Sequence, residues 1–104
     1  MIISTTENVP GKTVKEVLGI VRGNTVRVKW FGKDFVASLR SIVGGEVSEY
    51  TEMMTEAREQ AFQRMIEKAE KLDADAIICV RFMTAEVMRG AAEMLCYGTA
   101  VKLK

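Results

Sequence analysis

Four sulfur-bearing side chains in the C-terminal third are the residues of this sequence that could do the most specific chemistry. They are Cys79, Met83, Met94 and Cys96. If the two β-prone stretches that carry them pair as a hairpin around Arg89-Gly90, the alternation of side chains puts all four on one face, with Met83 opposite Cys96. Thiolate and thioether sulfurs suit Cu(I) and other soft metals. We therefore name these four as candidate metal ligands; the competing interpretation is that the sulfurs only pack.

The absence of histidine excludes several classes of function. The chain has 104 residues, two cysteines and no histidine, so Ser-His-Asp and Cys-His catalysis and histidine metal sites are excluded within one subunit. The spacing of the cysteines fits neither a zinc pair nor a redox C-x-x-C motif, and no glycine-rich phosphate loop occurs. We therefore assign no catalytic residue, and a soft metal ion is the one cofactor that the sequence indicates.

Two further patterns could bind ligands. Glu52 and Glu56 lie one helical turn apart and could hold a hard cation weakly, although a solvated helix surface explains them as well. A second group interleaves basic and aromatic residues as a surface for single-stranded nucleic acid would; its members are Arg27, Lys29, Trp30, Phe31 and Lys33. Because the net charge is only +1, we expect an aromatic subunit contact there and no nucleic-acid partner.

No segment resembles an export signal or a membrane span. The first residues, Met1 to Ser4, are too short for an apolar export region, and no run of eighteen apolar residues occurs. We therefore expect a cytoplasmic protein with no membrane contact, in which both cysteines remain free thiols.

The hydrophobic periodicity predicts a single domain over residues 1–104 of the α+β class. Strands are expected at residues 2–6, 13–21, 25–30, 76–83 and 94–103, with a turn or bulge at Gly23-Asn24. Asp34 can cap a short helix that ends before Gly44-Gly45, and Ser48 can cap a long helix to about Leu72. We expect an antiparallel sheet with the short and the long helix on one face. The long helix has one apolar stripe, which includes Met54, Ala57, Ala61 and Met65.

Strand alternation predicts which side chains the long helix covers. The bulkier sets are expected to face it: Ala76, Ile78, Val80 and Phe82 on one strand, and Leu95, Tyr97, Thr99, Val101 and Leu103 on the last. The opposite face, which would carry the four sulfurs, is too apolar to stay in water. A second copy of the chain is its expected partner.

An ordered series of short motifs resembles the YbjQ-like family over nearly the whole chain. The motifs are Val9-Pro10-Gly11, residues 15–23, residues 41–45, residues 56–61 and residues 97–101. The resemblance implies an α+β unit that assembles into a ring-shaped homopentamer, and it carries the family description "putative heavy-metal-binding". In the family pattern, Ala or Gly stands where this chain has Cys79.

These observations favour a non-enzymatic oligomeric binding or scaffold module that holds a metal or small ligand between subunits. The alternative is an enzyme with a carboxylate and Lys/Arg site at subunit boundaries. No residue in the sequence names a substrate, so the two hypotheses are separated by assaying for bound ligand and for turnover.

Overall fold

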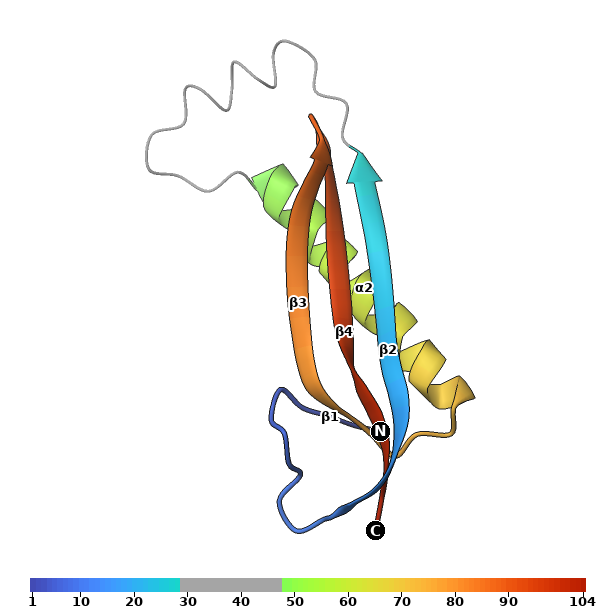
Figure 1. Ribbon diagram of the computed structural model, residues 1–104. Helices are drawn as coiled ribbons and strands as arrows, with labels where there is room; N and C mark the ends of the chain where they lie inside the picture. Colours follow the sequence, from blue (N-terminus) through green and yellow to red (C-terminus); the bar gives the residue numbers. More distant parts are fainter. Residues whose placement is uncertain (29–47) are drawn as a thin grey trace.

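The part of the chain that the structure describes is a four-stranded mixed sheet with one long helix on one face. The computed structural model describes residues 1–28 and 48–104. Its elements are β1 (Ile2–Ile3), β2 (Val14–Val28), α2 (Ser48–Lys71), β3 (Ala76–Met88) and β4 (Ala91–Leu103), and the strand order is β1-β3-β4-β2 (Figure 1). The α+β class is confirmed. The wholly antiparallel sheet is corrected, because β1 runs parallel to β3. The predicted short helix at 34–43 lies outside the described residues.

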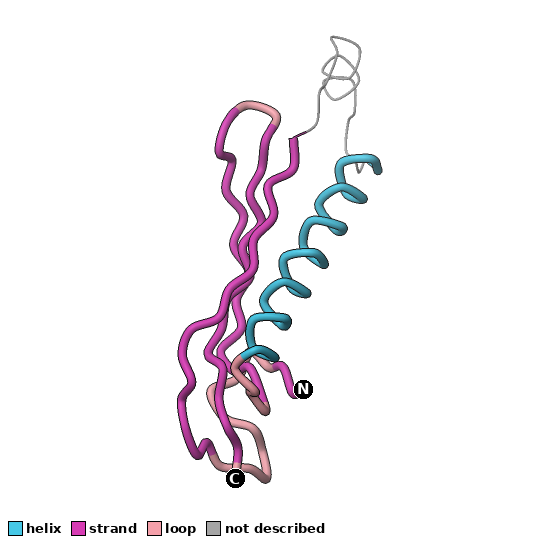
Figure 2. Tube along the Cα trace, turned by 90° about the vertical axis from the view of Figure 1, so that its right-hand side faces the viewer, coloured by secondary structure: helices cyan, strands magenta, loops and turns pink. Residues whose placement is uncertain are grey.

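Helix α2 begins and ends close to where the sequence predicts. It packs against one side of the sheet (Figure 2), with Ala57, Ala61, Met65 and Ala69 fully buried. At its C-terminus Asp73 has φ 58°, the Ala74 amide donates to Ala69 O at 3.1 Å and the Asp73 amide to Glu70 O at 2.9 Å. This is a Schellman ending. No helix in the described ranges is long and apolar enough to cross a membrane.

Strand β2 is one continuous strand, so the predicted interruption at Gly23-Asn24 is wrong. Gly23 pairs in register with Cys96 of β4, and a Cβ built on it would overlap the Ala61 carbonyl oxygen and lie 2.5 Å from the Met65 amide nitrogen of α2. The glycine therefore lets the helix approach the sheet, and makes no turn. The irregularities of β2 lie nearer its start: its register with β4 shifts between Val14 and Glu16 and again between Val17 and Gly19, where φ is +133°.

The predicted faces of β4 are reversed. Met94, Cys96 and Ala100 pack in the cluster beneath α2, while Val101 packs in a second cluster on the other face. The partly buried Leu95 and Tyr97 alternate with the covered residues and so also lie on the open face. The backbone approach at Gly23 leaves room for small or flexible side chains opposite it, and bulky side chains are placed outside.

In β3 the prediction is half right, because a bulge changes the alternation. Ile77 lies under α2, and Ile78 lies in the open-face cluster. Cys79 then has φ 55°, the register with β4 shifts between Ile78 and Arg81, and the next residue, Val80, also lies under α2. The inserted residue moves every later side chain to the other face. The prediction is correct for Val80 and Phe82 and wrong for Ala76 and Ile78.

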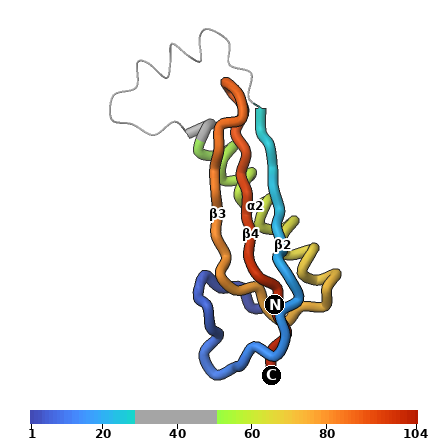
Figure 3. The backbone as a smooth tube through the Cα atoms, in the orientation of Figure 1, coloured from blue at the N-terminus to red at the C-terminus, as the bar shows by residue number. Residues whose placement is uncertain are grey.

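Among the described residues, the open face of the sheet is covered at one end only. There Ala76, Ile78 and Val101 form a small buried cluster with Val9 and Val14, beneath the N-terminal loop drawn in blue in Figure 3. Toward the β3–β4 turn, larger apolar side chains on β2 and β3 are exposed; they are Ile20, Val26, Val28, Met83, Val87 and Met88. The expected apolar open face is therefore present; Cys79 and Met83 lie on it as predicted, and the other predicted sulfurs, Met94 and Cys96, do not.

Candidate functional site

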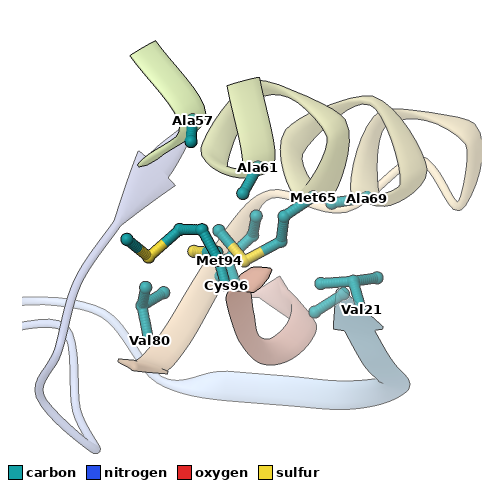
Figure 4. Packing of buried hydrophobic residues seen from close by; sticks show 10 residues of the cluster. Val21, Ala57, Ala61, Met65, Ala69, Val80, Met94 and Cys96 are labelled. Carbon is teal, nitrogen blue, oxygen red and sulfur yellow. Dashed lines mark hydrogen bonds between the residues drawn. The ribbon is translucent and has the colours of Figure 1, made fainter. Parts of the chain in front are cut away.

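Three sulfur-bearing side chains share the core between α2 and β4. Met94 and Cys96 point from β4 toward the helix, and Met65 points from α2 toward the sheet (Figure 4). All three side chains are at most 2% exposed. The Cys96 Sγ–H donates to Met65 Sδ at 3.5 Å, and the Thr84 hydroxyl donates to Met94 Sδ at 3.4 Å. We call Met65, Met94 and Cys96 the sulfur cluster.

Local structure fixes each member of the sulfur cluster. Met65 belongs to the apolar stripe of α2, flanked one turn away on either side by Ala61 and Ala69. Met94 and Cys96 are two residues apart on β4 and therefore share its covered face. Because Gly23 stands beside Cys96 on β2, nothing separates the strand from the helix backbone there, and the thiol reaches Met65.

The surroundings of Cys96 hold its thiol in the protonated form. Burial raises the pKa of Cys96 to about 11, because an apolar interior disfavours the thiolate. One polar atom nearby has no partner among the described residues: Thr25 Oγ1 is buried, and Thr25 is the register neighbour of Met94 on β2. The cluster is therefore neutral, with a hydroxyl beside it that makes no hydrogen bond in this part of the chain.

The other two predicted ligands lie elsewhere. Met83 is 56% exposed and pairs in register with Leu95 on the open face. Cys79 is partly buried at the bulge, packs against the open-face cluster, and its amide donates to Thr6 O at 3.1 Å. The expectation that all four sulfurs share one face, with Met83 opposite Cys96, is wrong: Phe82 is the residue opposite Cys96. The reversed faces of β4 put Met94 and Cys96 under α2, and a register shift between Glu86 and Met88 brings Phe82 opposite Cys96.

Sequence reasoning missed Met65 as a neighbour of Cys96. The helical stripe indicates that Met65 is buried, but periodicity does not reveal which strand residue it meets. A usable signal was the glycine on β2: a glycine inside an alternating strand often marks close backbone approach. Interpreted as a point of close approach, Gly23 would have predicted that α2 contacts β2 there, next to Cys96 on β4.

A second candidate site is a pocket between α2 and β3. It has a volume of about 350 Å³ and is lined by Thr55, Arg58, Glu59, Phe62 and Phe82. The two phenylalanine rings stack with centroids 6.0 Å apart and an interplanar angle of 24°. An apolar wall with a few polar groups at its rim is typical of small-ligand sites.

The weaker candidates from the sequence acquire no site in the described structure. Glu52 and Glu56 are exposed on α2, and within residues 1–28 and 48–104 no three Cys, Asp or Glu side chains gather to hold a metal. The Arg27 guanidinium donates to Gln60 Oε1 at 2.9 Å. The other members of the basic and aromatic group lie outside the described residues.

Comparison with known proteins gives a family but no activity. The model of a family described as "Putative heavy-metal-binding" matches residues 1–104. A UPF0145 protein of Thermosipho melanesiensis is 59% identical over 99% of this chain and 95% of its own length. A UPF0145 protein of Archaeoglobus fulgidus is 59% identical over 100% of this chain and 96% of its own length.

A solved structure supports the fold. It is a protein with unknown function from Pediococcus pentosaceus, 20% identical, with a TM-score of 0.65, and the match covers 100% of this chain and 98% of that one. At this identity the likeness concerns the fold alone.

Proposed function

The chain belongs to the YbjQ-like family described as "Putative heavy-metal-binding", and from that premise we propose that it is a self-associating binding module. Copies join through the edges of their sheets, and a metal or small ligand is held within or between them. The observation that carries the proposal is the apolar, unpaired edge of β3. The family resemblance supplies the expected number of copies, five.

The edges of the sheet support self-association. Strand β3 pairs with β1 only through Ile2 and Ile3, so residues 81–88 have no strand on their outer side within the described part of the chain. This segment exposes apolar side chains, among them Phe82, Met83, Val87 and Met88. Strand β2 forms the other edge and exposes Val26 and Val28. Long apolar edges of this kind are sites of strand pairing between chains.

Strand direction and register indicate how the copies would join. Strands β2 and β3 both run antiparallel to β4 and are therefore parallel to each other. Arg22 and Arg81 both pair with Tyr97, and Val28 and Met88 both pair with Ala91, so residues 22–28 lie level with the free segment 81–88. If the copies are related by rotation about an axis parallel to the strands, residues 22–28 of one copy stay at the same height as residues 81–88 of the next. This rotation would place the β2 edge of one copy beside the β3 edge of the next, a head-to-tail contact that can close into a ring.

The pocket at Phe62 and Phe82 gives the module a place for a small ligand. It lies beside the free segment of β3, since Phe82 belongs to that segment. A neighbouring copy on this edge would cover part of the pocket, so that a ligand would be held between two subunits. Pockets of this volume are large enough for a small organic molecule.

The sulfur cluster is the place in the described structure whose donor atoms suit a heavy metal. One thiol and two thioethers meet in the sulfur cluster, a set that suits soft ions and is poor for Mg²⁺ or Ca²⁺. Of the four ligands expected from the sequence, Cys96 and Met94 belong to this set. Cys79 and Met83 are proposed as ligands only in combination with residues of another copy, because neither reaches the cluster.

Native mass spectrometry of untagged protein, with elemental analysis of the same sample, tests the proposal. A homo-oligomer, expected to be a pentamer, with little free monomer supports the proposal. Light scattering at micromolar concentration should give the same mass. A particle of 11.6 kDa would overturn the proposal. Bound ligand without turnover on generic hydrolase substrates favours the binding module, and turnover favours the alternative of an enzyme at subunit boundaries.

Lysine variants locate the contact. Val26→Lys on β2 and Val87→Lys on β3 should each release monomers, because both introduce charge into the proposed edges. Val17→Lys is the matched control: Val17 is also an exposed valine on β2 but lies outside residues 22–28. If the control dissociates the oligomer as strongly as the other two, the copies do not join at this level.

A further inference from the structure

We propose that the sulfur cluster is a binding site for one univalent soft metal ion, Cu(I) or Ag(I), inside each subunit. The ligands are Cys96, Met65 and Met94. The inference deepens the binding role proposed above by naming the ion and the atoms. It places the ion within one subunit, so its test does not depend on whether copies associate.

The distance between two of the sulfurs supports a shared ion. Cys96 Sγ and Met65 Sδ are 3.5 Å apart and share one thiol hydrogen. Two metal–sulfur bonds of about 2.3 Å each span this separation. An ion could therefore take the place of the shared proton without moving β4 away from α2, and Met94, on the same face of β4, is the third sulfur available.

The charge of the cluster selects the class of ion. The site contains one acidic proton, that of Cys96, and the thioethers have none. When a univalent ion binds, the Cys96 S–H bond breaks, a sulfur–metal bond forms and the proton leaves to solvent, so the net charge of the buried site does not change. A divalent ion such as Cd(II) or Zn(II) would leave one uncompensated positive charge in an apolar core, which is costly.

A buried hydroxyl with no partner among the described residues supports a site beside the sulfurs. Thr25 Oγ1 is buried without a partner in the described part of the chain, on the covered face at the register position of Met94. Buried polar atoms are normally paired. The Thr84 hydroxyl holds Met94 Sδ from the β3 side. An ion among the sulfurs would give the Thr25 oxygen a favourable electrostatic neighbour.

The experiment uses the full-length Cys79→Ser protein, in which Cys96 is the only thiol. Ag(I) is titrated under native mass spectrometry, with Cd(II) in a parallel series. We expect one silver ion per subunit, with a mass gain equal to one silver less one proton, and no stoichiometric cadmium. Thermal unfolding should shift upward with silver, because an ion that binds only the folded state stabilises it.

Three variants in the same background assign the ligands. Cys96→Ala and Met65→Leu should each lose stoichiometric silver, and circular dichroism checks that they fold. Met65→Leu nearly conserves side-chain volume, so the variant is expected to fold as the parent does. Met83→Leu is the matched control, an exposed methionine on the open face, and should bind as the parent does.

The outcomes separate cleanly. Absence of silver from the folded Cys79→Ser protein, or equal silver binding by Met65→Leu and Met83→Leu, overturns the site. Stoichiometric cadmium without loss of silver overturns the charge argument. A monomer that still binds one silver refutes self-association and leaves this inference intact, and a metal-free pentamer does the reverse.

Discussion

The two faces of the sheet differ in the size of their side chains. Where α2 comes closest, the strands contribute Gly23, Gly98, Cys96 and Ala100, all buried, against a helix stripe made largely of alanine. The larger Val21, Ile77 and Val80 fill the space beside them. On the open face the side chains are larger, and many are exposed: Ile20 is 77% accessible. The difference teaches that close packing of backbone on backbone, rather than the bulk of the side chains, decides which face the helix covers.

The largest loss of stability is expected from a substitution on the covered face where α2 and β2 are closest. Gly23→Ala should lower the free energy of unfolding by about 3 kcal/mol, the upper part of the range for overpacking, because the new methyl group would overlap the Ala61 carbonyl of α2. Asn24→Ala, the next residue and exposed on the other face, should change it by less than about 0.5 kcal/mol. Urea denaturation of both variants measures the contrast, and equal losses would show that the helix does not contact β2 there.

A moderate effect is expected where the covered face meets solvent. Phe82 stacks on Phe62 but is 44% exposed, so Phe82→Ala should cost about 1–2 kcal/mol, less than the 3–5 of a fully buried phenylalanine. The measurement is the same denaturation experiment on oligomer and monomer. A loss of about 4 kcal/mol confined to the oligomer would mean that another copy buries the ring.

The bulge that separates the two halves of β3 should respond to glycine. Cys79 has φ 55°, a conformation that costs a side-chain-bearing residue about 1 kcal/mol or more. We expect Cys79→Gly to be more stable than Cys79→Ala by about 1 kcal/mol, since both lose the sulfur and only glycine relieves the backbone. Thermal unfolding of the pair measures this, and a more stable alanine variant would contradict the bulge.

The smallest effect concerns pH at the covered end of the open face. The Leu103 amide donates to Asp75 Oδ2 at 2.8 Å, and this hydrogen bond, aided by Lys102, lowers the pKa of Asp75 below 3.8. The ionised form is favoured in the folded state, so its stabilisation is present above pH 3.8 and is lost as pH falls through the lowered pKa. Asp75→Asn should flatten the stability curve in that window. If the decrease of stability at acidic pH is the same in Asp75→Asn, the hydrogen bond between Leu103 and Asp75 contributes nothing to stability.

Local signals in the sequence were sufficient for much of the fold. The helix from Ser48, the strand from Ala76, the last strand and the turn at Arg89-Gly90 follow from periodicity, capping and turn residues, and the described structure places them within a few residues of the prediction. The ordered motifs were sufficient for the family. Each of these features depends on a residue and its near neighbours in the chain.

The candidate site depends on contacts that the sequence does not encode locally. Cys96 and Met94 were nominated from their chemistry, but their neighbour Met65 is 31 residues from Cys96 in the chain. One inserted residue at Cys79 changed the faces of β3, and alternation from the sequence alone does not reveal such a bulge. Alternation placed Cys79 and Met83 on the open face, as the structure does, but it assigned Met94 and Cys96 to the same face, whereas they lie under α2.

The sequence by itself determined most of the described elements, the absence of imidazole chemistry and the presence of an apolar face that α2 does not cover. These follow from residue types and short-range periods. Only the tertiary structure decided which side of each strand α2 covers, because that choice depends on where two backbones come close enough to require glycine. The same approach brings Cys96 within 3.5 Å of Met65, so the sulfur cluster results from the packing of α2 against β4.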